Sequence, residues 1–262
     1  MEQKQGYFVV SLDFELFWGM SDKYTLAEYG PNVLGVRTAL PRILEEFTKY
    51  GIHATWATVG MLMCRNKDEL LSLLPPHDKR PTYSDMRMSS YHHIELDGIG
   101  KNEDDDPYHY GASLVEKILN TQNQELANHT FSHYYAADGE SNTSDSLRVD
   151  LDAHRVSAKT YGIETTSIIF PRNQVNDEAL QICCEKGITA YRGNEDHFLY
   201  RARKESEQSL FIRALRLKDH YLNLSGHHTY PLPTHAKGHP SQEAKGGLLY
   251  MEIGRASCRE RV

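Results

Sequence analysis

Apolar residues along the chain recur in two alternating patterns, one typical of strands and the other of helices. Residues 6–12 form an apolar run, and residues 53–60 form a second run rich in β-formers. Between these runs, apolar residues repeat at helical spacing: Val36, Leu40, Ile43, Leu44 and Phe47. We expect this helix to begin near Pro41 and to end at Gly51, a residue suited to a C-terminal cap.

The rest of the chain continues the alternation. The spacing predicts helices at 70–74, 113–119, 147–158 and 176–185, and strands at 124–128, 165–170, 188–191, 211–217 and 247–251. Ser113 and Asn176 are suited to cap two of these helices. The polar stretch 75–107 shows no clean period, and we predict an insertion made of loops. Strands that alternate with helices predict a parallel sheet with helices outside.

Composition narrows the class of protein. The chain has 262 residues, of which 39% are hydrophobic and 25% charged, as expected of one α/β domain. A formal charge of -7 argues against a nucleic-acid partner, which requires clustered Lys and Arg. No run reaches the roughly 20 apolar residues of a membrane helix, and no signal peptide is recognisable. With no disulfide or zinc-ribbon spacing among the cysteines, we expect a cytoplasmic protein. The sequence does not indicate an oligomeric state.

Two histidines and two acids follow predicted strands. His129 and His133 stand four residues apart, directly after the strand 124–128. On one helical turn, these two imidazoles could close on a single metal ion. A chain with 14 histidines will also contain such pairs by chance. The first strand adds weight to the metal hypothesis, because it ends in Asp13 and Glu15, which alternation places on one side.

A third polar cluster, Pro171, Arg172 and Asn173, follows the strand 165–170. All three clusters therefore come after the carboxyl ends of predicted strands, the face on which parallel α/β barrels build active sites. One acid and two histidines leave open positions for water, which is typical of a catalytic zinc. The second acid could then serve as a general base.

Three motifs resemble the polysaccharide deacetylase family, also called carbohydrate esterase family 4 or the NodB homology domain. They are Ser-Leu-Asp-Phe-Glu at 11–15, Ala-Thr-Trp-Ala-Thr-Val-Gly at 54–60 and His-Thr-Phe-Ser-His at 129–133. The resemblance spans residues 7–193. It implies a distorted (β/α) barrel of about seven strands that removes N-acetyl groups from a carbohydrate by attack of a metal-bound water. The implied cofactor is a divalent metal, usually Zn²⁺.

The resemblance also implies roles for individual residues. Asp13 matches the catalytic base, and His129 and His133 match the two metal histidines. The commonest form of the first motif has adjacent aspartates, whereas this chain has Phe14 in between, so the third metal ligand is assigned to Glu15. Arg172 is expected to brace Asp13, although the family usually places the arginine before the proline. The alternative for Arg172 is a surface salt bridge.

Further candidates carry less weight. Pro171 and Asn173 are expected to line the substrate site. Trp18 could stack on a sugar together with the neighbouring phenylalanine, or the pair could belong to the core. The adjacent histidine pairs 92–93 and 227–228 are poor metal sites, because adjacent side chains diverge in an extended chain.

Residues 252–262 resemble the translation of a sequencing-adapter oligonucleotide. We therefore expect one barrel domain over residues 1–251, truncated within its last strand. The family places a general-acid histidine after such a strand, and no histidine follows Met251. The expectation is a chain that assembles its metal site but is catalytically crippled. Two alternatives remain open: an amidohydrolase acting on a small non-peptide amide, and a barrel that binds without catalysis.

Overall fold

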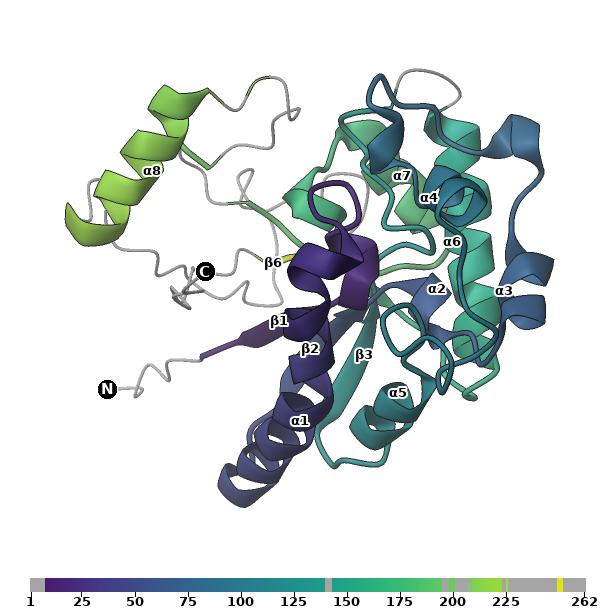
Figure 1. Ribbon diagram of the computed structural model, residues 1–262. Coiled ribbons are helices and arrows are strands. Elements are labelled where there is room, and N and C mark those ends of the chain that lie inside the picture. Colours follow the sequence, from purple (N-terminus) through teal and green to yellow (C-terminus); the bar gives the residue numbers. More distant parts are fainter. Residues whose placement is uncertain are drawn as a thin grey trace.

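A parallel sheet of six strands organises the chain (Figure 1). The computed structural model describes residues 8–139, 143–194, 198–200, 207, 209–222, 225 and 249–251. The strands are β1 (Val10–Phe14), β2 (Ala54–Thr58), β3 (Gln124–Asn128), β4 (Ser167–Ile168), β5 (Ala190–Arg192) and β6 (Leu249–Met251). The helices are α1 (Leu26–Tyr50), α2 (Gly60–Met63), α3 (Lys67–Leu73), α4 (Ser90–Leu96), α5 (Ala112–Leu119), α6 (Thr143–Lys159), α7 (Asp177–Glu185) and α8 (Leu210–Leu222). Short 3₁₀ turns are η1 (Leu16–Gly19), η2 (His77–Lys79), η3 (Met86–Met88) and η4 (Pro171–Asn173).

The strands pair in chain order, from β1 to β6, and every pairing is parallel. The register sets Phe14 beside Thr58 and Thr58 beside Asn128, so the carboxyl ends of β1, β2 and β3 lie level. The predicted α/β fold with parallel strands is confirmed. Six of the seven predicted strands are strands in the structure, and the expected tail 252–262 lies outside the described residues.

Helix α1 is longer than the sequence pattern indicated. It begins after Thr25, which forms a capping box with Glu28, and it ends at Gly51 in the left-handed conformation (φ 62°). The predicted cap at Gly51 is correct, whereas the predicted start near Pro41 is wrong because that proline lies inside the helix. The cap at Thr25 precedes the apolar repeat by three turns, which is why periodicity missed it.

Two other predictions are wrong. Residues 211–217 lie in α8 and do not form a strand. The stretch 75–107 was expected to be loops, but it contains helix α4, whose N-terminus is capped by the Ser89 hydroxyl. Asp85 caps the preceding turn η3 in the same way. Local caps therefore create short helices where no apolar period exists.

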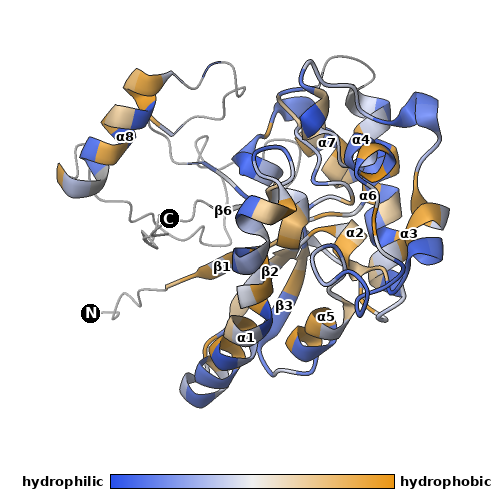
Figure 2. Cartoon of the chain, viewed as in Figure 1, coloured by the Kyte–Doolittle hydropathy of each residue, from blue (hydrophilic) through white to orange (hydrophobic). Residues whose placement is uncertain are grey.

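Two apolar cores flank the sheet. The larger core packs α1, α2 and α5 against β1 to β3, and the second packs α6 and α7 against β4 and β5. Figure 2 shows apolar colour on β1 and hydrophilic colour on the exposed last turns of α1. None of the described helices is long and apolar enough to cross a membrane.

Candidate metal centre

Glu15, His129 and His133 converge at the carboxyl end of the sheet. Glu15 follows β1 and His129 follows β3, and the level ends of these strands bring the residues together. Oε1 of Glu15 lies 2.8 Å from Nε2 of His129 and 3.1 Å from Nε2 of His133. Their ligand atoms all lie within 4.8 Å of one another. The three residues predicted to bind the metal thus form one cluster.

The expected helical turn that carries the two histidines is wrong. Thr130 and His133 adopt φ angles of 63° and 57°, so residues 129–133 form an irregular loop, called here the histidine loop. Side chains supply the hydrogen bonds that a helix would have made. Oδ1 of Asn128 accepts from the amide of Thr130 (2.7 Å), and Oγ1 of Thr130 accepts from the amide of Tyr134 (2.7 Å). Asn and Thr side chains often compete with helical hydrogen bonds in this way.

The hydrogen bond on the far side of the His129 ring fixes its tautomer. Nδ1 of His129 lies 2.8 Å from the carbonyl oxygen of Ile169, which can only accept. Nδ1 therefore carries the proton, and in the neutral ring the lone pair of Nε2 points at the Glu15 carboxylate. Two electron-rich atoms 2.8 Å apart require a proton or a cation between them. This donor arrangement fits a divalent metal, whose histidine ligands usually donate their other N–H to a carbonyl or carboxylate.

Charge at the cluster favours an ionised Glu15. Burial opposes ionisation, but the neighbouring His133 and His129 bring the pKa of Glu15 well below its usual range. His129 and His133 are themselves buried, with 0% and 3% of their surface exposed. A partly exposed carboxylate between two buried imidazoles is the ligand set of a borderline metal such as zinc.

Asp13 is held by an arginine that the sequence analysis missed. Nη1 of Arg192 lies 2.8 Å from Oδ1 of Asp13, and Nη2 lies 2.9 Å from Oδ2. The same guanidinium reaches Oγ of Ser11 (3.2 Å) and Oδ1 of Asn173 (3.0 Å). Arg192 ends β5, four strands from Asp13 in the sheet. Only the curvature of the sheet brings them together, so no local motif could have indicated the pair.

Arg172 occupies a different place from the one predicted. Its guanidinium pairs with Asp22 and lies over the ring of Tyr135, 4.4 Å from the ring centre. The Tyr135 ring in turn packs edge-on against His133, with 4.9 Å between ring centres. The predicted brace on Asp13 is therefore supplied by Arg192, because η4 turns Arg172 into the left-handed conformation (φ 54°) and away from the expected path. The alternative surface salt bridge does not fit either, since both partners are largely buried.

The three residues expected to contact substrate differ in their surroundings. Asn173 touches Arg192 and so lies beside Asp13. Pro171 is buried at the start of η4. Trp18 is 1% exposed, and its indole N–H donates to the carbonyl oxygen of His109 (2.8 Å). Trp18 therefore belongs to the core, which was the alternative considered for it, and in this structure it presents no ring face for a sugar.

His93 contacts the buried ring of His109. Its Nε2 lies 2.8 Å from Nε2 of His109, while the Nδ1 atoms of the two rings face Asp97 (2.9 Å) and Asp106 (2.7 Å). A ring separation of 5.0 Å shows that the two imidazoles meet end to end, as in a shared hydrogen bond. The sequence showed His92 and His93 as an adjacent pair and gave no indication of this contact. The other adjacent pair, 227–228, lies outside the described residues.

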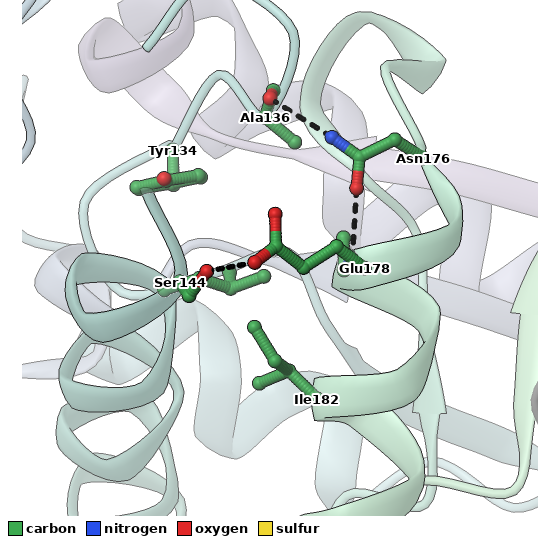
Figure 3. A pocket seen from close by; sticks show the side chains of 8 residues that line it. Tyr134, Ala136, Ser144, Asn176, Glu178 and Ile182 are labelled. Carbon is green, nitrogen blue, oxygen red and sulfur yellow. Dashed lines mark hydrogen bonds between the residues drawn. The ribbon is translucent and has the colours of Figure 1, made fainter. Parts of the chain in front are cut away.

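A small cavity lies beyond the histidine loop, between α6 and α7 (Figure 3). Tyr134, Asn176 and Glu178 line it, and Glu178 accepts a hydrogen bond from the hydroxyl of Ser144. Its volume of about 10 Å³ is room for about one water. The cavity is too small for a sugar and is not a substrate site.

No family model matches the chain, and no curated protein matches it. Several solved structures are similar to it. A carbohydrate esterase family 4 pseudoenzyme from Bacillus anthracis is 17% identical over 70% of this chain and 42% of its own, with a TM-score of 0.37. A de-N-acetylase from Aggregatibacter actinomycetemcomitans is 14% identical over 79% of this chain and 73% of its own, with a TM-score of 0.44. A 4-α-glucanotransferase from Thermococcus litoralis is 14% identical over 76% of this chain and 24% of its own, with a TM-score of 0.40.

The chain spans less than half the length of the Bacillus protein. The name of the Bacillus protein gives carbohydrate esterase family 4, the family that the motifs of this chain resemble, and the Aggregatibacter protein is named a de-N-acetylase. These matches are similarities in the path of the chain, and one of them is to a pseudoenzyme. The function is therefore inferred from the site residues themselves.

Proposed function

We propose that the chain is a metal-dependent hydrolase that removes N-acetyl groups from a carbohydrate. The observation that carries the proposal is the convergence of Glu15, His129 and His133 next to an Asp13 carboxylate held by Arg192. A ligand set of two imidazoles and one carboxylate leaves coordination positions open, as hydrolytic zinc sites do. A non-catalytic barrel has no need of both the ligand cluster and an oriented carboxylate.

The protein residues would divide the work as follows. Glu15, His129 and His133 would hold the cation, which when bound lowers the pKa of water and polarises a carbonyl. Asp13 would take the proton from the attacking water as general base. Arg192 would orient Asp13, since it engages both carboxylate oxygens with two nitrogen atoms. The identity of the metal as Zn²⁺ and the carbohydrate substrate are part of this proposal.

Metal content and acetate release test the proposal together. Purified protein from a zinc-replete preparation should contain about one equivalent of zinc, and a His129→Ala, His133→Ala double variant should contain none. The same protein should release acetate at a low rate from N-acetylated sugar oligomers, assayed beside a panel of small amides. Metal-free wild-type protein would contradict the metal site. Metal-loaded protein that cleaves only the small amides would instead favour the amidohydrolase alternative.

A further inference from the structure

The histidine loop has a strained backbone that its few local side-chain hydrogen bonds only partly support. Thr130 and His133 both have positive φ angles, a region that residues with a Cβ atom rarely adopt. The loop also lacks the internal hydrogen bonds of a helix. Contacts from outside must therefore fix the path that aims both Nε2 atoms at Glu15.

Asp150, in the middle of α6, supplies contacts of this kind. Its Oδ1 accepts from the backbone amide of Phe131 (2.6 Å), and its Oδ2 accepts from the amide of Ser132 (3.1 Å) and from the Ser132 hydroxyl. The hydroxyl of Tyr91 lies 3.4 Å from the same oxygen. Phe131 and Ser132 are two of the three residues between the histidines, so Asp150 binds the centre of the loop.

Helix α2 holds the opposite side of the same loop. The amide of Gly60 donates to the carbonyl oxygen of Thr130 (2.9 Å), and the amide of Met61 donates to that of Phe131 (3.0 Å). These are the first amides of α2, which have no partner within their own helix. The loop thus gives the carbonyl groups of Thr130 and Phe131 to α2 and the amides of Phe131 and Ser132 to Asp150.

As a buried charged residue, Asp150 is suited to binding the backbone amides of the histidine loop and not to packing in an apolar core. It is fully buried, with 0% of its surface exposed. Burial raises the pKa of Asp150 to about 6, so the side chain is ionised at neutral pH. A buried carboxylate is costly unless donors surround it, and each contact described above is a donor. An asparagine of the same shape would place an N–H₂ group where one of these donors now points.

We propose that Asp150 is a positioning residue for the metal centre. Its carboxylate sets the path of the histidine loop so that His129 and His133 face Glu15. The inference rests on the proposed function, since it assumes that a cation binds these three residues. It assigns a role to a residue that touches neither the cation nor the substrate.

Zinc binding measured by calorimetry tests the proposal. The wild-type protein and the variants Asp150→Asn, Ser132→Ala and Leu151→Ala are stripped with chelator and titrated with zinc. We expect Asp150→Asn to weaken zinc binding by about 10- to 100-fold, the usual effect of losing a residue that orients a metal ligand. Ser132→Ala keeps both backbone contacts and should lose affinity by a smaller factor.

Leu151→Ala is the matched control, because it opens a cavity at the neighbouring core position of α6 without touching the histidine loop. It should lose thermal stability and keep the zinc affinity of the wild type. Wild-type affinity in Asp150→Asn overturns the proposal, and so does an equal loss of affinity in Leu151→Ala. If Asp150→Asn does not fold, Ser132→Ala decides, and unchanged zinc affinity in that variant overturns the proposal.

The outcomes for the wild type separate this inference from the proposed function. A wild-type protein that binds no zinc contradicts the proposed function and the inference together. Zinc that binds equally well to the wild type and to Asp150→Asn contradicts the inference alone. Protein that binds zinc through an Asp150-dependent loop but releases no acetate contradicts the proposed function and supports the inference.

Discussion

The Asp13 carboxylate has both of its oxygens engaged by Arg192, while the metal ligands lie on the residues that follow β1 and β3. This separation predicts distinct effects of substitution. Asp13→Asn should lower turnover by a factor on the order of a hundred or more while zinc stays bound, because the variant loses a general base and no ligand. Steady-state acetate release and zinc content measured on the same preparation check this. Loss of zinc along with activity would show that Asp13 is a ligand.

Arg192 should matter to catalysis through geometry as well as charge. Arg192→Lys keeps the positive charge but cannot hold two oxygens at once, so the Asp13 carboxylate loses its fixed orientation. We expect the turnover number to fall by roughly 10- to 100-fold with little change in zinc affinity. Arg148→Lys is the control, since that arginine forms an exposed ion pair with Glu185. Equal activity of the Arg192 variant and the control would remove Arg192 from the mechanism.

Among the elements, α2 approaches the histidine loop so closely that only glycine fits at its first residue. A Cβ atom on Gly60 would lie 2.7 Å from Cδ2 and 2.9 Å from Cα of Phe131. Gly60→Ala should therefore cost about 1–3 kcal/mol of unfolding free energy and weaken zinc binding, because the backbone of the loop must shift. Chemical denaturation and zinc titration measure the two effects.

The control for that variant is Gly35→Ala in α1, where nothing lies within 4 Å of the added methyl group. That substitution should stabilise the protein by about 0.5–1 kcal/mol, the helix preference of alanine over glycine. A Gly60→Ala protein as stable as the Gly35→Ala protein would show that the loop adapts without cost.

His154, in α6, should make the folding stability of the protein depend on pH. It is fully buried and its Nε2–H donates to the carbonyl oxygen of Thr58 (3.0 Å), and burial lowers its pKa from 6.5 to about 4. Below pH 6.5 His154 becomes protonated in the unfolded chain, whereas in the folded protein it stays neutral down to about pH 4. Stability should therefore fall as the pH falls across this window, by at most about 3 kcal/mol.

His154→Gln keeps a donor for Thr58 and removes the titrating group. In the presence of chelator, denaturant midpoints between pH 7 and 4 should fall less steeply for the variant than for the wild type. The two proteins share every other side chain, so the difference between the two slopes isolates His154. Parallel slopes would contradict the assignment.

What the sequence predicts about this molecule depends on how local the determining contacts are. Strand β2 and the cap of α7 at Asn176 were predicted correctly, because a run of β-forming residues and a capping side chain act within a few residues. Glu15 and the histidines were also found, since the strand ends that carry them are recognisable in the sequence. Arg192 was missed, because its partner Asp13 lies 179 residues away along the chain. Asp150 was missed for the same reason, as only packing reveals which backbone amides a buried acid faces.

At the scale of the whole molecule, a bound cation would join segments that are distant in the chain. Glu15 and His133 are separated by 118 residues, and the β1 and β3 ends that carry them are held level by the sheet alone.

A ligand that binds only the folded state adds stability that depends on its concentration, about 2.7 kcal/mol at a hundred times its dissociation constant. For a chain of this size, that corresponds to a rise of roughly 5–10 °C in Tm. Zinc added to chelator-stripped protein should produce this rise, and Glu15→Gln, which keeps the size but loses the charge of the ligand, should abolish it. Equal Tm values with and without zinc would mean that the three residues meet without serving as a metal site.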